Sequence, residues 1–132
     1  RHPYHGDFVS LSRSFRRKES AIRKAIQWSG EACFTMNNNW GYCANDHYYK
    51  PASMLIKKLV ECVSKGGNMI LNVGPDAKGK FPKESSAILA EIGRWMDKNH
   101  DSIYGCVPAE NIPKPDYGRI TRNGNKVLCP YL

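Results

Sequence analysis

The apolar run at residues 69–73, Met-Ile-Leu-Asn-Val, constrains the fold more than any other feature of this 132-residue chain. A short, nearly continuous apolar run is typical of a parallel strand that is buried on both faces. The run lies between two segments with helical spacing, and another short strand is expected earlier, at residues 31–36. This alternation of strand and helix predicts an α/β fold with a parallel sheet.

The segment before the run predicts a helix from about Pro51 to Lys65. Proline suits the first turn of a helix, and Gly66-Gly67 forms a stop signal. Four apolar residues follow the i, i+3, i+4, i+7 spacing of one helix face: Ile56, Leu59, Val60 and Val63.

A second helix is predicted from about Pro82 to the Asn99-His100 pair. Its apolar residues fall on one side: Ile88, Leu89, Ile92, Trp95 and Met96. Residues 37–50 and 74–80 are expected to form loops. Beyond Pro108 the pattern changes, because prolines mark a linker over residues 108–116 and two short runs flank Asn123-Gly124. These runs, at residues 117–121 and 126–128, predict a β-hairpin.

The formal net charge of +8 suggests a nucleic-acid or acidic membrane partner at first sight. The charge is concentrated in residues 11–30, which hold one acidic residue, Glu19, and six basic ones: Arg13, Arg16, Arg17, Lys18, Arg23 and Lys24. A basic nucleic-acid-binding module is therefore an alternative function that depends almost wholly on this segment.

The cysteines are odd in number and scattered, with no C-x-x-C pair: Cys33, Cys43, Cys62, Cys106 and Cys129. This pattern argues against a disulfide framework or a zinc site and predicts mostly buried thiols in a reducing compartment, which favours the cytoplasm. The apolar stretches are too short for a membrane span. The chain begins with Arg1, so we expect a truncated start that carries no readable signal peptide.

Three motifs follow one another in the first two thirds of the chain. They read Glu31-Ala32-Cys33, then Asn37-Asn38-Asn39-Trp40-Gly41-Tyr42, then Lys65-Gly66-Gly67-Asn68 continuing through Asn72-Val73-Gly74-Pro75. Their order and spacing resemble the W-E-x-C, N-x-x-W-G-Y and K-G-G-N-x-L-L-N-V-G-P segments of the α-L-fucosidase family of retaining glycoside hydrolases. The resemblance covers roughly Glu31 to Lys126.

This resemblance implies that residues 1–107 are the C-terminal part of a (β/α)8 TIM-like barrel and that residues 117–132 begin a C-terminal β-sandwich. The parent enzyme would hydrolyse terminal α-L-fucosides of oligosaccharides or glycoconjugates with retention, without a cofactor or metal. Retention needs two carboxyl groups about 5–5.5 Å apart. The family's nucleophile is an aspartate upstream of Arg1, so we expect this chain alone to be inactive.

The resemblance also suggests site residues. Glu31 matches the Glu of W-E-x-C and is a candidate acid/base or supporting carboxylate; the alternative is a surface carboxylate at the start of a strand. The competing position is the Glu of a family S-P-E-Q segment, whose place is taken here by Ser12. Trp40 sits where the family places an aromatic residue at the sugar pocket, although core packing is an equally open explanation. The three asparagines at 37–39 either bind sugar hydroxyls or satisfy loop backbone, and Asn72 is expected to hydrogen-bond the adjacent loop.

Residues 11–30 do not fit the family pattern, although both flanks do. With permitted codons, a reading shifted by one nucleotide gives P-E-Q-E-L-P-E-E-G-I-R-D-P-E-S-D-P-V-E-W. This reading restores S-P-E-Q after Ser10 and places a Trp directly before Glu31. We therefore hypothesise an out-of-frame translation between two compensating indels; the alternative is a genuine basic insertion. The nucleotide sequence from Ser10 to Glu31 distinguishes them.

Two further patterns have weak support. Residues 74–80 fit the phosphate-binding G-x-x-x-x-G-K pattern, but Phe81 replaces the Ser or Thr that would hold Mg²⁺, and Pro75 and Pro82 remove amide donors. A strand–helix connection is the better interpretation. Two histidine pairs, His47 with Asp46 and His2 with His5, suggest a metal site, but their spacing matches no established one, and these histidines are expected to be solvated loop residues.

Overall fold

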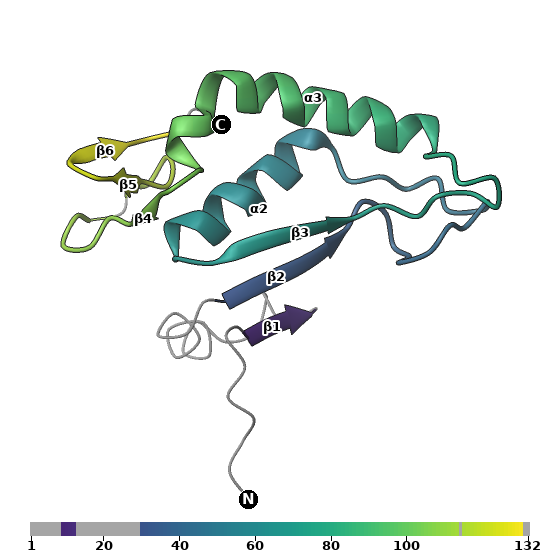
Figure 1. Ribbon diagram of the computed structural model, residues 1–132, viewed down its shortest axis with the longest axis horizontal. Helices are drawn as coiled ribbons and strands as arrows, with labels where there is room; N and C mark the ends of the chain where they lie inside the picture. The colour runs from purple at the N-terminus through teal and green to yellow at the C-terminus, as the bar shows by residue number, and fades with distance from the viewer. Residues whose placement is uncertain (1–8, 13–29, 114, 131–132) are drawn as a thin grey trace, which may run out of the picture.

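The computed structural model describes residues 9–12, 30–113 and 115–130 (Figure 1). Its first layer is a parallel sheet of three strands, in the order β1 (Val9–Ser12), β2 (Gly30–Thr35) and β3 (Asn68–Asn72). Ser12 pairs with Cys33, and Thr35 pairs with Asn72. The predicted α/β class with a parallel sheet is confirmed, and β1 is a strand that the sequence patterns did not reveal.

Helix α2 (Ala52–Ser64) begins directly after Pro51, close to the predicted boundary. It ends at the predicted stop signal, where Gly66 has a φ of 79°. The N–H of Gly66 donates to the carbonyl of Val63 at 2.9 Å, and that of Gly67 donates to the carbonyl of Cys62 at 2.9 Å. Glycine adopts this left-handed conformation without a steric penalty, so the pair closes the helix and directs the chain into β3.

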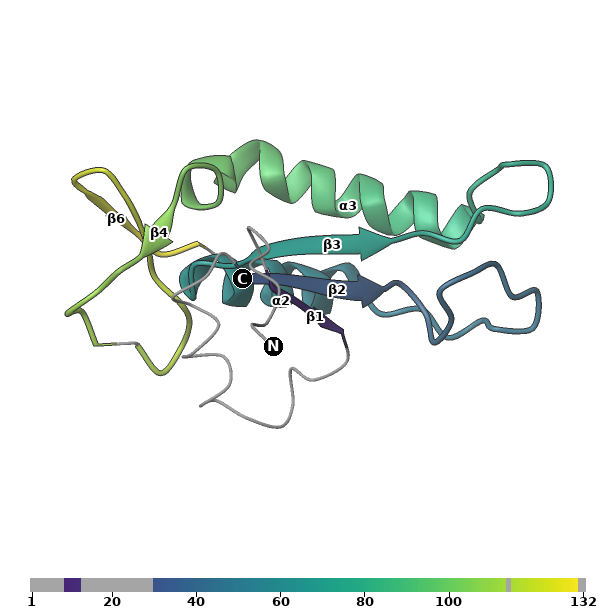
Figure 2. The same cartoon turned by 60° about the horizontal axis from the view of Figure 1, so that its bottom comes forward.

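Helix α3 (Lys83–Asn99) follows β3 and continues into a short 3₁₀ turn, η2 (His100–Ser102). Both helices lie on the same side of the sheet, with α3 packed on α2 (Figures 1 and 2). The buried core joins the two helices and the turn after them: Ile56, Val60, Val63 and Ile103, with Leu59, Ile92, Trp95, Met96 and Cys106 packed around it. The apolar stripe predicted for α2 therefore forms the centre of the core.

Strand β3 differs from its prediction as a strand buried on both faces. The side chain of Ile70 is 46% exposed, while Met69 and Leu71 are half-buried. Since successive side chains of a strand point to opposite faces, one face of β3 meets the helices and the other has no layer over it among the described residues. The apolar run is thus typical of a strand buried on both faces, but among the described residues only the face toward the helices is covered.

The C-terminal residues form a small antiparallel sheet of β4 (Val107–Pro108), β5 (Thr121–Asn123) and β6 (Lys126–Leu128). The predicted hairpin around Asn123-Gly124 is confirmed, with Gly124 at a φ of 56°, but its first strand starts at Thr121 rather than at residue 117. Strand β4 lies on the expected boundary between the barrel segment and the linker. The domain limits themselves stay a prediction.

This second sheet lies beside the amino-terminal end of the parallel sheet (Figure 1). The buried hydroxyl of Thr121 donates to the carbonyl of Ser102 at 2.9 Å. The Asn123 amide donates to the carbonyls of Asp101 at 3.1 Å and Tyr104 at 3.2 Å. These bonds satisfy carbonyl groups of η2 and of the turn after it, and they fix the hairpin to that end of the helical layer.

Candidate active site at the carboxyl end of the parallel sheet

Two loops leave the carboxyl ends of neighbouring parallel strands. Residues 36–51 connect β2 to α2, and residues 73–82 connect β3 to α3; both loops project from the same end of the molecule (Figure 1). In parallel α/β folds the loops at this end of the sheet build the ligand sites. The motif residues 37–42 and 72–75 lie here, so the structure brings them together.

The loop after β2 is organised around the carboxylate of Asp46. Its Oδ2 atom accepts hydrogen bonds from the backbone N–H of Asn38 at 2.9 Å and from the side-chain amide of Asn39 at 2.7 Å. Its Oδ1 atom accepts the N–H of Tyr48 at 3.1 Å. Desolvation raises the pKa of Asp46, but these hydrogen bonds from Asn38, Tyr48 and Asn39 outweigh it and hold the pKa below its ordinary value. Asp46 is therefore an ionised loop anchor.

Lys50 attaches the same loop to the end of β2. Its backbone N–H donates to the carbonyl of Met36 at 2.8 Å. Its ammonium group donates to the Thr35 hydroxyl at 3.2 Å and to the Asn37 carbonyl. Partial burial lowers the pKa of Lys50, and the nearby charge of Asp46 opposes that shift. Sequence reasoning missed both anchors, although an Asp that bonds N–H groups two residues onward is a recognisable loop signal.

The two loops touch each other at Trp40 and Gly41. The Asn72 side-chain amide donates a hydrogen bond to the Trp40 carbonyl, which confirms the structural role expected for Asn72. A Cβ atom at Gly74 would lie 2.6 Å from the backbone carbon of Gly41 and 2.6 Å from the nitrogen of Tyr42. The end of β3 thus supports the Trp-Gly-Tyr segment directly, and only glycine leaves room for that contact.

The aromatic side chains at this end are exposed rather than packed in the core. Trp40 is 41% exposed and Tyr42 is 53% exposed, and Tyr48 and Phe81 are exposed as well. Core packing does not explain an aromatic residue with that exposure. The amide of Asn39 and the Oδ1 atom of Asn37, which accepts the Asn39 N–H at 3.1 Å, are occupied inside the loop. For these two asparagines the backbone-satisfying interpretation fits the structure.

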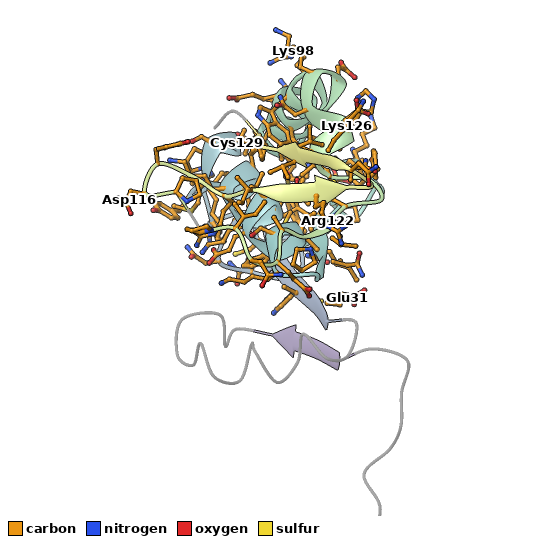
Figure 3. The ribbon with its side chains drawn as sticks, turned by 90° about the vertical axis from the view of Figure 1, so that its left-hand side faces the viewer. Glu31, Lys98, Asp116, Arg122, Lys126 and Cys129 are labelled. Carbon is orange, nitrogen blue, oxygen red and sulfur yellow. The ribbon has the colours of Figure 1, made fainter. Side chains whose placement is uncertain are left out.

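Glu31 lies apart from these residues, near the start of β2. Its backbone pairs with Asn68 at the amino-terminal end of β3. At about 3.3 Å per residue, Glu31 is about 13 Å from the carboxyl end of its own strand. Figure 3, which views the molecule from the side of the second sheet, shows Glu31 on that side, below Arg122. The structure therefore does not bring the predicted site residues Glu31 and Trp40 together.

The competing position for a carboxylate has a different location. Ser12 is the last residue of β1, and its backbone pairs with Cys33, so it lies toward the carboxyl end of the parallel sheet. The rest of the basic segment, residues 13–29, lies outside the described residues, as do His2 and His5. The nucleic-acid alternative depends on that segment.

The loop after β3 does not have the form of a phosphate cradle. The Asp76 Oδ1 atom accepts the N–H groups of Lys78 and Lys80, both at 2.8 Å. The Gly79 N–H donates to the Asp76 carbonyl at 2.9 Å. A phosphate would need these amides, but the carboxylate and the backbone carbonyl of Asp76 already bind them. The interpretation as a strand–helix connection agrees with this geometry.

The cysteines differ from their prediction, since only Cys62 is buried and Cys129 is exposed. Burial raises the pKa of the Cys62 thiol to about 11, with the charge of Glu61 adding to the effect, so this group stays protonated near neutral pH. Within the described part of the chain, no three His, Cys, Asp or Glu side chains gather as a metal site would require. The helices in that part are too short or too polar to span a bilayer.

The comparison with known proteins agrees with the motifs at this end of the sheet. The sequence model of the α-L-fucosidase family matches residues 4–101. This chain belongs to the α-L-fucosidase family. An α-L-fucosidase of Dictyostelium discoideum is 43% identical over 83 residues, which are 59% of the chain and 17% of that protein. The human plasma α-L-fucosidase is 33% identical over 103 residues, 76% of the chain and 21% of that protein.

Solved fucosidase structures share the fold. α-L-Fucosidase isoenzyme 1 from Paenibacillus thiaminolyticus superposes with a TM-score of 0.82 and 46% identity, covering 92% of the chain and 29% of that protein. A Bacteroides thetaiotaomicron GH29 α-L-fucosidase, trapped as a covalent intermediate with 2-fluoro-fucosyl fluoride, has a TM-score of 0.81 and 37% identity over 92% of the chain and 29% of that protein. The chain thus spans less than a third of these fucosidases.

Proposed function

We propose that this chain is the C-terminal part of the catalytic barrel of an α-L-fucosidase, followed by the first strands of a C-terminal β-sandwich. Three neighbouring parallel strands with two helices on one side are an arrangement that can continue into a closed (β/α)8 barrel. The uncovered face of β3 would then be the inward face of that barrel. The similarity to solved fucosidases over 92% of the chain supports this placement.

The proposed reaction is the hydrolysis of terminal α-L-fucosides with retention, by way of a covalent fucosyl-enzyme intermediate. The observation that carries the proposal is the position of Trp40 on a loop at the carboxyl end of the sheet, half-exposed and fixed by two strands. An aromatic face suits the apolar side of a deoxy sugar, whose methyl group makes no hydrogen bond. The trapped intermediate of the Bacteroides fucosidase supports a covalent route.

A retaining mechanism requires a nucleophile and an acid/base about 5–5.5 Å apart. Asp46 and Asp76 lie at the carboxyl end of the sheet, where a catalytic carboxylate is expected, but both carboxylates accept hydrogen bonds from N–H groups of their own loops. We therefore propose that the nucleophile comes from a part of the barrel outside this chain. For the second carboxylate, position 12 at the end of β1 is better placed than Glu31. The shifted reading would supply a glutamate at that position.

The proposal is tested by comparing the 132-residue chain with the full-length protein in which residues 11–30 carry the shifted reading, so that a glutamate stands at position 12. We expect the full-length protein to release the phenol from an aryl α-L-fucoside with the α-anomer of fucose as first product, as followed by NMR. The chain alone should give no turnover. Turnover by the chain alone, abolished by Glu31→Gln, would restore Glu31 as the catalytic carboxylate and overturn this account.

Trp40→Ala in the full-length protein should lower kcat/KM about tenfold or more, since a lost apolar contact to a substrate is worth roughly 10–200-fold. Tyr104→Ala is the matched control, because Tyr104 is exposed, aromatic and located near the opposite end of the sheet. Equal effects of the two substitutions would contradict a sugar-binding role for Trp40.

A further inference from the structure

The orientation of the Trp40 ring is not fixed by burial. The side chain is 41% exposed, and the adjacent Gly41 has no side chain that could pack against it. The backbone sets the point from which the side chain extends and limits the rotamers that the ring can adopt. The position of the Trp40 backbone therefore determines where the ring lies relative to a bound sugar.

Most contacts that hold this backbone are local. The hydrogen bonds of Asp46 and Lys50 described above come from within residues 35–50, so they shape the loop without relating it to another strand. Asn72 is different, because it is 32 residues away in sequence and belongs to β3. Its amide donates to the backbone carbonyl of Trp40 itself, next to the Cα atom from which the ring extends.

Gly74, in the loop directly after β3, contacts the same segment. Its backbone lies so close to Gly41 and Tyr42 that an added Cβ would approach two atoms to within 2.6 Å. The Trp40 segment is thus bounded by a hydrogen bond from Asn72 and by a steric contact at Gly74. The hydrogen bond comes from the last residue of β3, and the steric contact comes from Gly74, two residues after the strand ends.

We propose that Asn72 is a positioning residue for Trp40: through its hydrogen bond to the Trp40 carbonyl, it sets the ring where it binds the apolar face of the fucosyl group. The inference rests on the proposed function. Asn72 does not touch the sugar in this account, and it acts through the Trp40 backbone alone. An incorrectly placed ring weakens contact with substrate and transition state alike, so KM should change more than kcat.

The experiment uses the full-length protein, with an aryl α-L-fucoside as substrate. We expect Asn72→Ala to raise KM about fivefold or more while kcat stays within about twofold. Asn72→Asp retains the shape of the side chain but loses the N–H donor, so it should have a similar effect. Asn68→Ala is the matched control, because Asn68 is an exposed asparagine at the other end of the same strand. It should leave KM unchanged.

A double-mutant cycle with Trp40→Ala separates positioning from a general loss of stability. If Asn72 acts through Trp40, Asn72→Ala should change kcat/KM by less than about twofold once the ring is absent. Additive effects of the two substitutions would overturn the proposal, and so would an unchanged KM in Asn72→Ala. If neither Asn72 variant gives a cooperative melt while Asn68→Ala does, Asn72 serves folding rather than positioning, and the proposal is wrong.

The outcomes also separate this inference from the proposed function. A well-folded full-length protein without fucosidase activity would contradict the proposed function. An active protein whose Asn72 variants behave like Asn68→Ala would contradict only the positioning role.

Discussion

At the scale of single residues, one carboxylate gives a polar loop a defined shape. Asp46 accepts hydrogen bonds from residues on both sides of the loop, at Asn38, Asn39 and Tyr48. A loop of this composition has little apolar area to bury, so backbone and side-chain hydrogen bonds must fix its course. The exposed aromatic residues of the site can then be held in place without being buried.

Gly74 is the residue at which a small change should matter most for this site. Gly74→Ala would place a methyl group against the backbone of Gly41 and Tyr42, which cannot move away as a flexible side chain would. We expect a loss of about 1–3 kcal/mol in the free energy of unfolding, the usual cost of forcing extra atoms into a packed site. Chemical denaturation of the full-length protein measures this loss.

Gly93→Ala is the control for that substitution. Gly93 lies inside α3, and a Cβ there would meet no atom within 4 Å. Replacing glycine by alanine in a helix should stabilise the protein by about 0.5–1 kcal/mol. A Gly74→Ala protein as stable as the wild type would show that the two loops do not approach each other as closely as described.

At the scale of elements, Glu61 connects helix α2 to the segment that leads into the second sheet. Its carboxylate pairs with Lys58 at 3.2 Å and Lys65 at 2.9 Å on the same helix, and with Arg119 at 3.3 Å. Desolvation raises the pKa of Glu61, but the pairs with Lys65 and Lys58 outweigh this effect and lower it to about 2. The ionised form is therefore favoured by folding.

This shift gives a pH-dependent prediction. Because the pKa of Glu61 is lower in the folded state than its ordinary value of 4.5, its stabilising contribution is complete above about pH 4.5 and is lost as the pH falls toward 2. Glu61→Gln should cost about 1 kcal/mol at pH 7, since the pair is partly exposed to solvent. Chemical denaturation between pH 7 and pH 2.5 should show that the variant and the wild type differ less in free energy of unfolding below pH 4.5 than at pH 7.

Glu91→Gln is the control, because Glu91 lies exposed on α3. It should change stability by less than about 0.5 kcal/mol at any of these pH values. If the Glu61→Gln protein were as stable as the wild type at pH 7, the ion pairs of Glu61 would not stabilise the connection between α2 and the segment that leads into the second sheet.

The elements also show what sequence patterns can and cannot reveal. Helices α2 and α3 and strands β2 and β3 were predictable, because apolar periodicity and glycine or proline boundaries are local signals. Strands β1 and β4 were not, since β4 spans only Val107 and Pro108 and forms through pairing with β5. The separation of Glu31 from Trp40 was implied, because the strand predicted at residues 31–36 begins at Glu31 and Trp40 follows its end.

At the scale of the whole molecule, the parallel sheet has helices on one side and no layer on the other among the described residues. Ile70 on β3 is 46% exposed, and β1 and β3 are the two edge strands of the sheet. An uncovered apolar strand with an open edge is a template for association with another chain. In the proposed full-length enzyme, the remaining strands of the barrel would cover this face.

We therefore predict that the 132-residue chain self-associates when it is produced alone. Size-exclusion chromatography with light scattering should show species larger than a monomer, increasing with concentration. Ile70→Lys should reduce this association because it places a charge on the open face. Val127→Lys, a change of similar character on the second sheet, should not. A monodisperse, cooperatively melting wild-type chain would contradict the prediction.

The location of the second sheet has a practical consequence for attaching this protein to other objects. The β5–β6 turn at Gly124 and Asn125 is exposed, and it lies beside the amino-terminal end of the parallel strands, whereas the Trp40 loop leaves the opposite end (Figure 1). A peptide tag inserted in that turn would anchor the protein to a bead or sensor chip with the Trp40 loop facing outward. Immobilisation through the loop at residues 76–80 would instead press the same face against the support.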